Sequence, residues 1–370
     1  MVLQAINAKF TSLKIKALNT YLTKGNEPLI IAGPCGAESK EQILKVAKDF
    51  SKIKAIKVLR AGIWKPRTRP NSFEGVGEEG LKWLSEARQK FNLLTTVEVA
   101  NAQHVELALK HKVDILWIGA RTTVNPFTVQ EIADAIKGAD IPVMIKNPIH
   151  ADLQLWLGAI ERINNSGIEK LIAVHRGFHF SGKSKYRNKP LWEIPIELKT
   201  IVPELPIICD PSHISGKREL IFDVAQKALN IGMNGLMIES HPDPDKALSD
   251  AQQQITPVAL QELLDKLQFR QTNSSNAEFT DKLNQLRQMI DEVDDELINV
   301  LKKRISIIEE IGHYKKDHNI TAFQLERWQE ILRTRPQWAE KLGISRNHIE
   351  KICQLLHEES IRLQNDIMKK

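Results

Sequence analysis

The sequence has few of the features that mark membrane, exported or disulfide-stabilised proteins. Its longest apolar runs, such as residues 29–32 and 205–209, are far shorter than the roughly 20 residues that a membrane-spanning helix needs. The three cysteines, Cys35, Cys209 and Cys353, form no CxxC pair, and the first residues contain no apolar core or cleavage signature of a signal peptide. We therefore expect a cytoplasmic protein whose cysteines are reduced.

The composition also excludes disordered and collagen-like chains. Hydrophobic residues make up 42% and charged residues 26% of the sequence, close to the average of globular proteins. The length of 370 residues exceeds the size at which one hydrophobic core usually stops growing, so two domains are expected. Residues 268–278, QFRQTNSSNAE, are polar and lack periodicity, as in an exposed linker. We place the domains at residues 1–267 and 279–370.

Basic residues are in excess, but no nucleic-acid motif accompanies them. The net charge is +6; residues 278–370 carry 16 basic and 17 acidic residues, whereas residues 1–277 carry 36 and 29. There is no basic tract with interleaved aromatic residues, no zinc-finger spacing and no RNP-like motif. Small anionic substrates of the larger domain explain the excess better than a nucleic acid does.

Eight short apolar runs alternate with helical patterns before the linker. They are residues 29–34, 55–60, 93–99, 114–119, 141–146, 171–175, 205–210 and 235–240. Eight such units in about 260 residues are typical of a (β/α)₈ barrel. The alternative is a doubly wound open sheet, but no run is followed by a GxGxxG turn. The sequence therefore predicts an α/β (β/α)₈ TIM barrel followed by an all-α helical domain.

Basic side chains close or follow most of these runs. The carboxyl ends of the strands form the active-site face of a (β/α)₈ barrel. The basic residues expected there are Arg60, Lys65, Arg67, Arg121, Lys146 and Arg176. One arginine alone would indicate only a solvated loop charge, but converging cations repel one another unless an anion binds between them. Because arginine binds phosphate and carboxylate in a bidentate manner, the group predicts substrates that carry both.

A second group at the same rim has the character of a metal site. It consists of Cys35, His213, Glu239 and Asp250. Taken singly, Cys35 would be a small buried residue and His213 a loop hydrogen-bonding residue. Together their sulfur, nitrogen and oxygen donors suit Mn²⁺, Fe²⁺, Co²⁺ or Zn²⁺. These residues leave the choice among the four ions open.

Several motifs resemble those of the 3-deoxy-D-arabino-heptulosonate 7-phosphate (DAHP) synthases of the short type, which is allied to the 3-deoxy-octulosonate 8-phosphate synthases. They are IIAGPC (30–35), LRAGIWKPRTRP (59–70), SFEGVGEEGL (72–81), IGAR (118–121), DPSH (210–213) and GLMIESHPDPDKALSD (235–250). The segment KPRT (65–68) is the most specific, because the octulosonate enzymes look different there. An octulosonate- or sialic acid-type synthase is the alternative activity.

The resemblance implies a metal-dependent condensation of phosphoenolpyruvate with erythrose 4-phosphate. It makes Cys35, His213, Glu239 and Asp250 the metal ligands, with Mn²⁺ the favoured ion. Phosphoenolpyruvate would be held by Arg60, Lys65, Arg121, Lys146 and Arg176. Erythrose 4-phosphate would contact Arg67 and Thr68. Lys65 is the candidate proton donor, and Glu98 is a weaker candidate for handling water.

After the linker the pattern is helical. Apolar residues recur every three or four positions from Asp281 to about Lys316, which predicts one amphipathic helix. Such a helix is roughly 54 Å long, whereas a domain of fewer than a hundred residues has a radius of gyration near 13 Å. Its own chain cannot cover it, so we expect a homodimer, and a larger homo-oligomer stays open. A helix broken at Gly312 is the alternative.

The same region resembles the all-helical chorismate mutases. The matching segments are LRQMIDEVDDELINVLKKR (286–304) and IGHYKK (311–316), followed by single residues further on. The resemblance implies rearrangement of chorismate to prephenate in a site that Arg287 of one chain shares with residues of the other, which are Arg304, Lys315, Arg327, Ser360 and Gln364. The arginines would clamp the carboxylates, and Lys315 and Gln364 would donate to the ether oxygen. Gln324 and Trp328 stand where some or many members have acidic residues.

We also expect the helical domain to regulate the barrel. Only 28 residues precede the first expected strand, too few for a separate domain that binds an aromatic amino acid. The helical domain is then the remaining candidate for feedback inhibition by prephenate or chorismate. A tail that only binds and regulates, without mutase activity, is the competing hypothesis.

Overall fold

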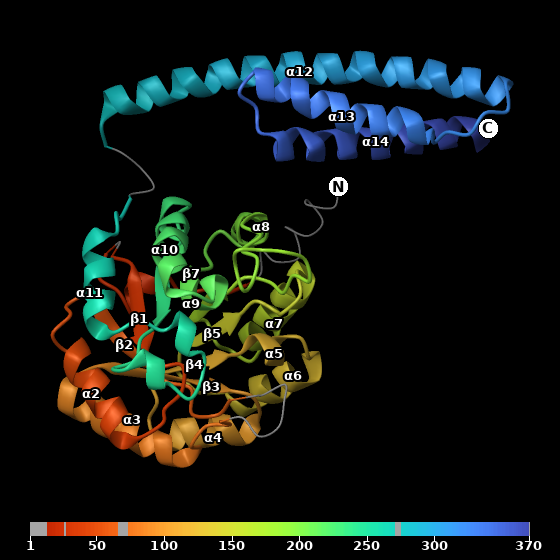
Figure 1. Ribbon diagram of the computed structural model, residues 1–370. Helices are drawn as coiled ribbons and strands as arrows, with labels where there is room; N and C mark the ends of the chain where they lie inside the picture. The colour runs from red at the N-terminus through yellow and green to blue at the C-terminus, as the bar shows by residue number, and fades with distance from the viewer. Residues whose placement is uncertain (1–12, 26, 66–72, 271–274, 370) are drawn as a thin grey trace. The chain divides into compact units, whose positions relative to one another are not determined.

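The computed structural model describes residues 13–25, 27–65, 73–270 and 275–369. The chain divides into two compact units, Met1–Thr272 and Asn273–Lys370. Among the described residues, all strands belong to the first unit (Figure 1). The predicted residues Arg67 and Thr68 lie outside the described residues.

The first unit is a closed parallel barrel in which the strands follow one another in chain order from β1 to β8. The strands are β1 Leu29–Gly33, β2 Ile56–Arg60, β3 Leu94–Val99, β4 Ile115–Ile118, β5 Val143–Lys146, β6 Leu171–His175, β7 Ile207–Cys209 and β8 Gly235–Glu239. Pairing of β1 with β8, from Leu29 opposite Gly235 to Gly33 opposite Glu239, closes the barrel. Each of the eight predicted runs contains one strand, so the predicted (β/α)₈ barrel is confirmed.

Amphipathic helices surround the barrel (Figure 1). In α2, Ser39 caps the first turn by accepting a hydrogen bond from the backbone N–H of Gln42, and Ile43, Val46 and Phe50 form its buried face. The larger helices are α2 Lys40–Phe50, α3 Glu78–Phe91, α4 Ala102–Lys110, α6 Pro126–Ala135, α7 Leu153–Asn165, α8 Glu193–Ile201, α10 Ile221–Asn230 and α11 Pro257–Lys266. Shorter ones are η1 Leu18–Thr20, α5 Ala120–Thr123, α9 Pro211–Ser215, η2 Arg218–Leu220, η3 Pro244–Lys246 and η4 Ala251–Gln253.

The apolar core of the barrel unit has two layers. One lies between the strands and the surrounding helices. The other fills the barrel interior and includes Val58, Trp117, Met144, Ile172 and Met237, contributed by five different strands. This packed interior means that the barrel has no open channel and that chemistry must occur at its rim.

Gly235 is a sensitive point in barrel closure. A side-chain carbon at Gly235 would lie 2.1 Å from the carbonyl oxygen of Leu29, which is backbone and cannot rotate away. We therefore expect Gly235→Ala to lower the free energy of unfolding of the barrel by about 3 kcal/mol, measured by denaturant titration. Gly158→Ala is the control, because nothing lies within 4 Å of a carbon there, and alanine favours the helix α7 by up to about 1 kcal/mol. Equal stability of the two variants would contradict this account.

The described part of the second unit, residues 275–369, contains three helices, α12 Ala277–Asp317, α13 Leu325–Lys341 and α14 Arg346–Lys369. The predicted long helix is confirmed, and α12 runs through Gly312 without the alternative break. Gly312 is buried, and a side-chain carbon there would lie 2.9 Å from Ile367 Cδ1 of α14. Glycine at this position therefore lets the two helices approach closely.

Among the described residues of the second unit, no helix lies along the amino-terminal part of α12 (Figure 1). Helices α13 and α14 lie along its carboxyl-terminal part (Figure 1). Met289, Val293 and Leu297 are 60%, 61% and 54% exposed. An exposed apolar stripe of this kind normally packs against another protein surface. None of the described helices combines the length and the apolar character that a bilayer span requires.

Candidate active sites

Four of the predicted ligands gather at the carboxyl ends of β1, β7 and β8. Ligand atoms of Cys35, Glu239 and Asp250 lie within 4.8 Å of one another. His213 of α9 stands beside this group, with its Nε2 3.8 Å from Glu239 Oε1. Glu239 Oε1 is buried, lies 3.1 Å from Arg60 Nη2, and accepts a hydrogen bond from no described residue. A thiol, an imidazole and two carboxylates therefore converge on one point.

Burial shifts the pKa values of two members of this cluster, Cys35 and His213. It raises the pKa of the Cys35 thiol to about 12, and the nearby Glu239 carboxylate adds to the rise. Burial also lowers the pKa of His213, although Asp210 and Glu239 oppose the change. The imidazole is therefore neutral at neutral pH, which is the form that binds a metal ion.

Lys65 is directed at the same cluster. Its ammonium donates hydrogen bonds to Cys35 Sγ at 2.7 Å and to the Cys35 carbonyl oxygen at 2.8 Å. The Lys65 side chain is half-buried. A proton carried by Lys65 is thus available at the edge of the candidate metal site.

Beside the cluster is a cavity of about 280 Å³ with several basic side chains in its wall. Its cations are Arg121, Lys146, Arg176 and Arg187. Lys146 is buried and donates a hydrogen bond to Asp210 Oδ2 at 2.8 Å, so part of its charge is compensated within the protein. Burial lowers the pKa of Arg176 to about 10, which still leaves it charged at neutral pH. The cavity suits a small ligand with more than one negative group.

Trp117 forms the floor of this region. Its ring lies beneath the Arg60 guanidinium, with 5.1 Å from Cζ to the ring centre, and 5.7 Å from the Lys146 ammonium. Its indole N–H donates to Glu98 Oε2 at 3.0 Å. One buried ring therefore orients two cations and a carboxylate of the site.

The helical unit has its own cavity, of about 500 Å³, between its three helices. Five predicted residues line it: Arg304, Lys315, Arg327, Ser360 and Gln364. Ser360 and Gln364 are buried, and the Gln364 side-chain Oε1 lacks a hydrogen-bond partner among the described residues. Four cations, counting Arg335, and no carboxylate occur among the lining residues. Such a cavity favours a dianion.

Arg287 is not among the residues that line this cavity. It is exposed on α12, and 17 positions separate it from Arg304. At 1.5 Å per residue the two lie about 25 Å apart along the helix. Arg287 therefore cannot complete the cavity of its own chain.

Comparison with known families identifies both units of the chain. Residues 11–274 match the DAHP synthetase I family, which is well over half of the chain. The chain belongs to the DAHP synthetase I family. Residues 286–365 match chorismate mutase type II, so the second unit is a chorismate mutase domain. The predicted resemblances are confirmed for both units, and the protein is an enzyme of aromatic biosynthesis with both activities.

Individual relatives of the synthase barrel support this assignment. Phospho-2-dehydro-3-deoxyheptonate aldolase of Thermotoga maritima is 34% identical over 253 residues, which are 68% of this chain and 71% of that protein. A crystal structure of the DAHP synthase from Thermotoga maritima superimposes with a TM-score of 0.58 at 33% identity, covering 64% of this chain and 67% of that chain. A 2-dehydro-3-deoxyphosphooctonate aldolase of Desulfotalea psychrophila is 30% identical over 264 residues, 66% of this chain and 89% of that protein.

Sequence reasoning missed several residues of the synthase barrel and of the mutase domain. Arg187 and Asn188 lie in the long connection between β6 and α8, with no strand pattern to mark them, yet both line the anion cavity. Arg335 and His357 line the mutase cavity, and Trp328 stacks on His357 with ring centres 4.2 Å apart. A helical-wheel comparison of α13 and α14 would have indicated His357, which lies one turn before Ser360.

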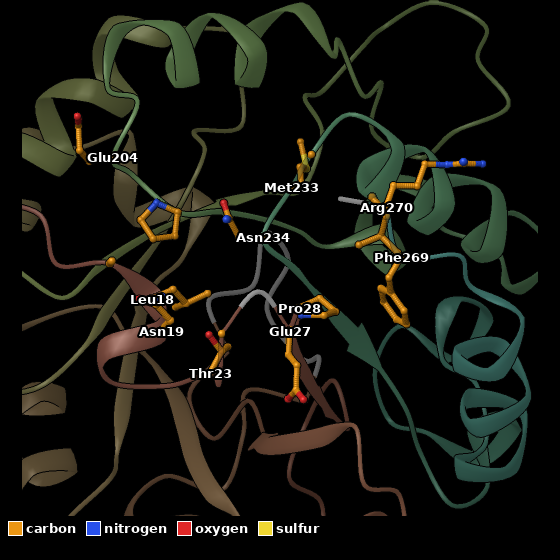
Figure 2. Close-up of a pocket in the computed structure, with 15 residues that line it drawn as sticks. Leu18, Asn19, Thr23, Glu27, Pro28, Glu204, Met233, Asn234, Phe269 and Arg270 are labelled. Carbon is orange, nitrogen blue, oxygen red and sulfur yellow. The ribbon is translucent and has the colours of Figure 1, made fainter. Parts of the chain in front are cut away.

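A larger cavity, of about 670 Å³, opens at the other end of the synthase barrel (Figure 2). It is lined by residues at or before the amino ends of β1, β7 and β8, among them Leu18, Pro28, Pro206 and Asn234, and by Phe269. Active sites of (β/α)₈ barrels lie at the opposite face, at the carboxyl ends of the strands. Among the described residues that line this cavity there is no cluster of cations or metal-ligating groups. Its size alone does not make it the active site.

Proposed function

We propose that the barrel condenses phosphoenolpyruvate with erythrose 4-phosphate at the rim formed by Cys35, His213, Glu239 and Asp250. The observation that carries the proposal is the grouping of Cys35, Glu239 and Asp250, with His213 beside them, next to a cavity with four cations. In the reaction, C3 of phosphoenolpyruvate attacks the aldehyde carbon, water adds at C2, and phosphate leaves. The product is DAHP together with inorganic phosphate.

The residues fit a divalent metal ion. The mixture of one sulfur, one nitrogen and two carboxylate donors suits Mn²⁺, which we favour, and also Fe²⁺, Co²⁺ or Zn²⁺. Glu239 Oε1, which lies 3.1 Å from Arg60 Nη2, and the neutral imidazole of His213 would both serve as ligands. A bound metal supplies Lewis-acid polarisation of the aldehyde oxygen.

Protein side chains bind and orient the substrates. Arg121, Lys146 and Arg176 would bind the phosphate and carboxylate of phosphoenolpyruvate, and Arg60 and Lys65 would complete that binding from the metal side. Lys65, with its ammonium beside Cys35, is the candidate donor of a proton to the new hydroxyl. Glu98 in the cavity wall is a candidate for orienting water. Arg67 and Thr68 stay predictions for contact with erythrose 4-phosphate.

A substrate comparison tests the synthase proposal. Purified protein is assayed for phosphate release from phosphoenolpyruvate with erythrose 4-phosphate or with arabinose 5-phosphate, before and after treatment with a chelator. We expect turnover with the tetrose phosphate only, and loss of turnover in the chelated protein until metal is added back. Preference for the pentose phosphate would establish the octulosonate alternative instead.

For the mutase domain, we propose that Arg304 and Arg327 clamp the two carboxylates of chorismate. Lys315 and Gln364 would donate hydrogen bonds to the ether oxygen, which gains negative charge in the transition state. Ser360, in the wall of the cavity, would help to position a carboxylate of chorismate. No acid, base or nucleophile is required, because a pericyclic rearrangement needs orientation and charge stabilisation only. The test is whether the purified chain converts chorismate to prephenate. A helical unit that only regulates the synthase would not do so.

A homodimer would complete the mutase site. The exposed apolar stripe of α12, with Met289, Val293 and Leu297, requires a cover, and the simplest cover is the same stripe of a second copy. Arg287 of one chain would then reach the cavity of the other. Sedimentation of the full chain tests the oligomeric state.

Occupation of the mutase cavity is expected to inhibit the synthase. Prephenate keeps both carboxylates and therefore suits the four cations that line the cavity. A coupling free energy of about 1 to 3 kcal/mol between the two sites would give a 5- to 150-fold effect. We expect prephenate to inhibit synthase turnover in the full chain, whereas an Arg304→Ala protein, with a weakened clamp, needs much more prephenate. Equal inhibition of both proteins would place the effector site elsewhere.

A further inference from the structure

Arg187 and Gln253 connect two carboxylates of the proposed metal site. The Arg187 Nη1 donates a hydrogen bond to Asp250 Oδ1 at 2.9 Å and another to Gln253 Oε1 at 2.7 Å. The Gln253 Nε2 in turn donates to Glu239 Oε2 at 2.6 Å. A continuous chain of hydrogen bonds therefore runs from Asp250 through a guanidinium and an amide to Glu239.

The chemistry of this chain requires a glutamine at its centre. A guanidinium only donates hydrogen bonds, so it fixes the amide oxygen of Gln253 on its own side. The amide NH₂ is then left to face the Glu239 carboxylate, which only accepts. A glutamate at this position would put a second carboxylate against Glu239, and a leucine would offer neither a donor nor an acceptor.

Water cannot take over the role of Gln253. The side chain is 1% exposed, and Glu239 is fully buried. Removing the amide would leave Glu239 Oε2 without the donor that now orients it. The other carboxylate oxygen, Oε1, is the one without a hydrogen bond and faces His213. Gln253 therefore determines which oxygen of Glu239 is presented to the site.

Asp250 depends on its neighbours in a similar way. Its backbone has φ of +49°, in the left-handed region that residues other than glycine seldom adopt. Its carboxylate is also contacted by Arg187, whose Nη1 lies 2.9 Å from Asp250 Oδ1 in an ion pair. The absence of a side chain at Gly216 leaves room for Arg187, because a side-chain carbon at Gly216 would lie 2.4 Å from Arg187 Cβ.

The loop that carries Arg187 also reaches the anion cavity. The next residue, Asn188, accepts a hydrogen bond from Arg176 Nη1 at 2.9 Å and donates one to the carbonyl oxygen of His213 at 2.6 Å. Asn188 therefore contacts Arg176 and the backbone of His213, and the adjacent Arg187 contacts Asp250 directly and Glu239 through Gln253. This loop thus reaches three of the four proposed metal ligands.

We propose that Arg187 and Gln253 are positioning residues that hold the carboxylates of Glu239 and Asp250 in the orientation that metal binding requires. The Arg187 charge also offsets the repulsion between two carboxylates that converge within a few ångströms. Neither residue need touch a substrate for this role. The inference rests on the metal site proposed above, and its test separates the two claims.

The experiment compares metal binding by the full chain and three variants. Apoprotein is prepared with a chelator and titrated with Mn²⁺, and free Mn²⁺ is followed by its electron paramagnetic resonance signal. Gln253→Leu removes the central amide, and Arg187→Gln removes the cation from a half-exposed position where folding is not at risk. Gln252→Leu is the matched control, because Gln252 is the adjacent, exposed glutamine. Thermal unfolding of each apoprotein checks that the barrel is folded.

Outer contacts of this kind typically change metal affinity by about 10- to 100-fold. We expect the Mn²⁺ dissociation constant to rise by that factor in Gln253→Leu and in Arg187→Gln, and to stay unchanged in Gln252→Leu. If the parent chain binds Mn²⁺ but Arg187→Gln binds it within twofold as tightly, the positioning role is refuted and the metal site stands. If the parent chain itself binds no Mn²⁺, the proposed manganese site is wrong.

Discussion

Replacing Cys35 by serine is expected to remove bound metal and synthase turnover together while leaving mutase turnover nearly unchanged. Cys35 is buried, and its sulfur is the one soft donor among the proposed ligands. Loss of a contact outside the ligand shell lowers metal affinity by up to about 100-fold, so loss of a direct ligand should lower it by at least as much. The mutase cavity is built from residues of the other unit and shares no described residue with the proposed metal site.

Metal content, measured by atomic emission, and the two turnover rates are determined on the same preparation. Cys209→Ser is the control, because Cys209 is equally buried but belongs to the core between the strands and the helices. It should keep both metal and synthase turnover. Full synthase turnover in a metal-free Cys35→Ser protein would show that the barrel does not use this site.

Arg304→Ala is expected to reduce mutase turnover by about 100-fold, because losing one arginine of the carboxylate clamp leaves chorismate poorly oriented for the rearrangement. Arg304 lines the mutase cavity and is only partly buried, so its removal should affect folding little. Arg333→Ala is the matched control, because Arg333 is exposed on α13 and does not line the cavity. Chorismate consumption followed by absorbance measures both variants.

Sharing of the mutase site between chains has a distinct signature. Arg287→Ala and Arg304→Ala proteins should each be nearly inactive alone. After subunit exchange, about half of the dimers are mixed and each mixed dimer has one intact site, so about one quarter of the parent turnover should return. Absence of recovery after exchange has been demonstrated would mean that Arg287 does not act across the interface.

The local pattern of the sequence was sufficient for the elements and for most of the rim. Each apolar run predicted a strand because a strand buried on both faces is continuously apolar, and this property needs no knowledge of partners. Arg60, Lys146 and Glu239 could be assigned to the rim because each is the last residue of its strand. The two activities were predicted because the motifs around Cys35 and His213 resemble those of DAHP synthases and the motifs of the helical domain resemble those of chorismate mutases.

The sequence by itself therefore determined the barrel, the helical domain and the kinds of residue that meet at each site. Only the tertiary structure decided how those residues pair. Lys146 binds Asp210, which is 64 positions away, and Arg187 binds Asp250, which is 63 positions away. Trp117 is one apolar residue of a run, and closure of the barrel places its ring beneath Arg60. Periodicity reports which face of an element is buried, whereas side-chain partners depend on how distant loops meet once the barrel has closed.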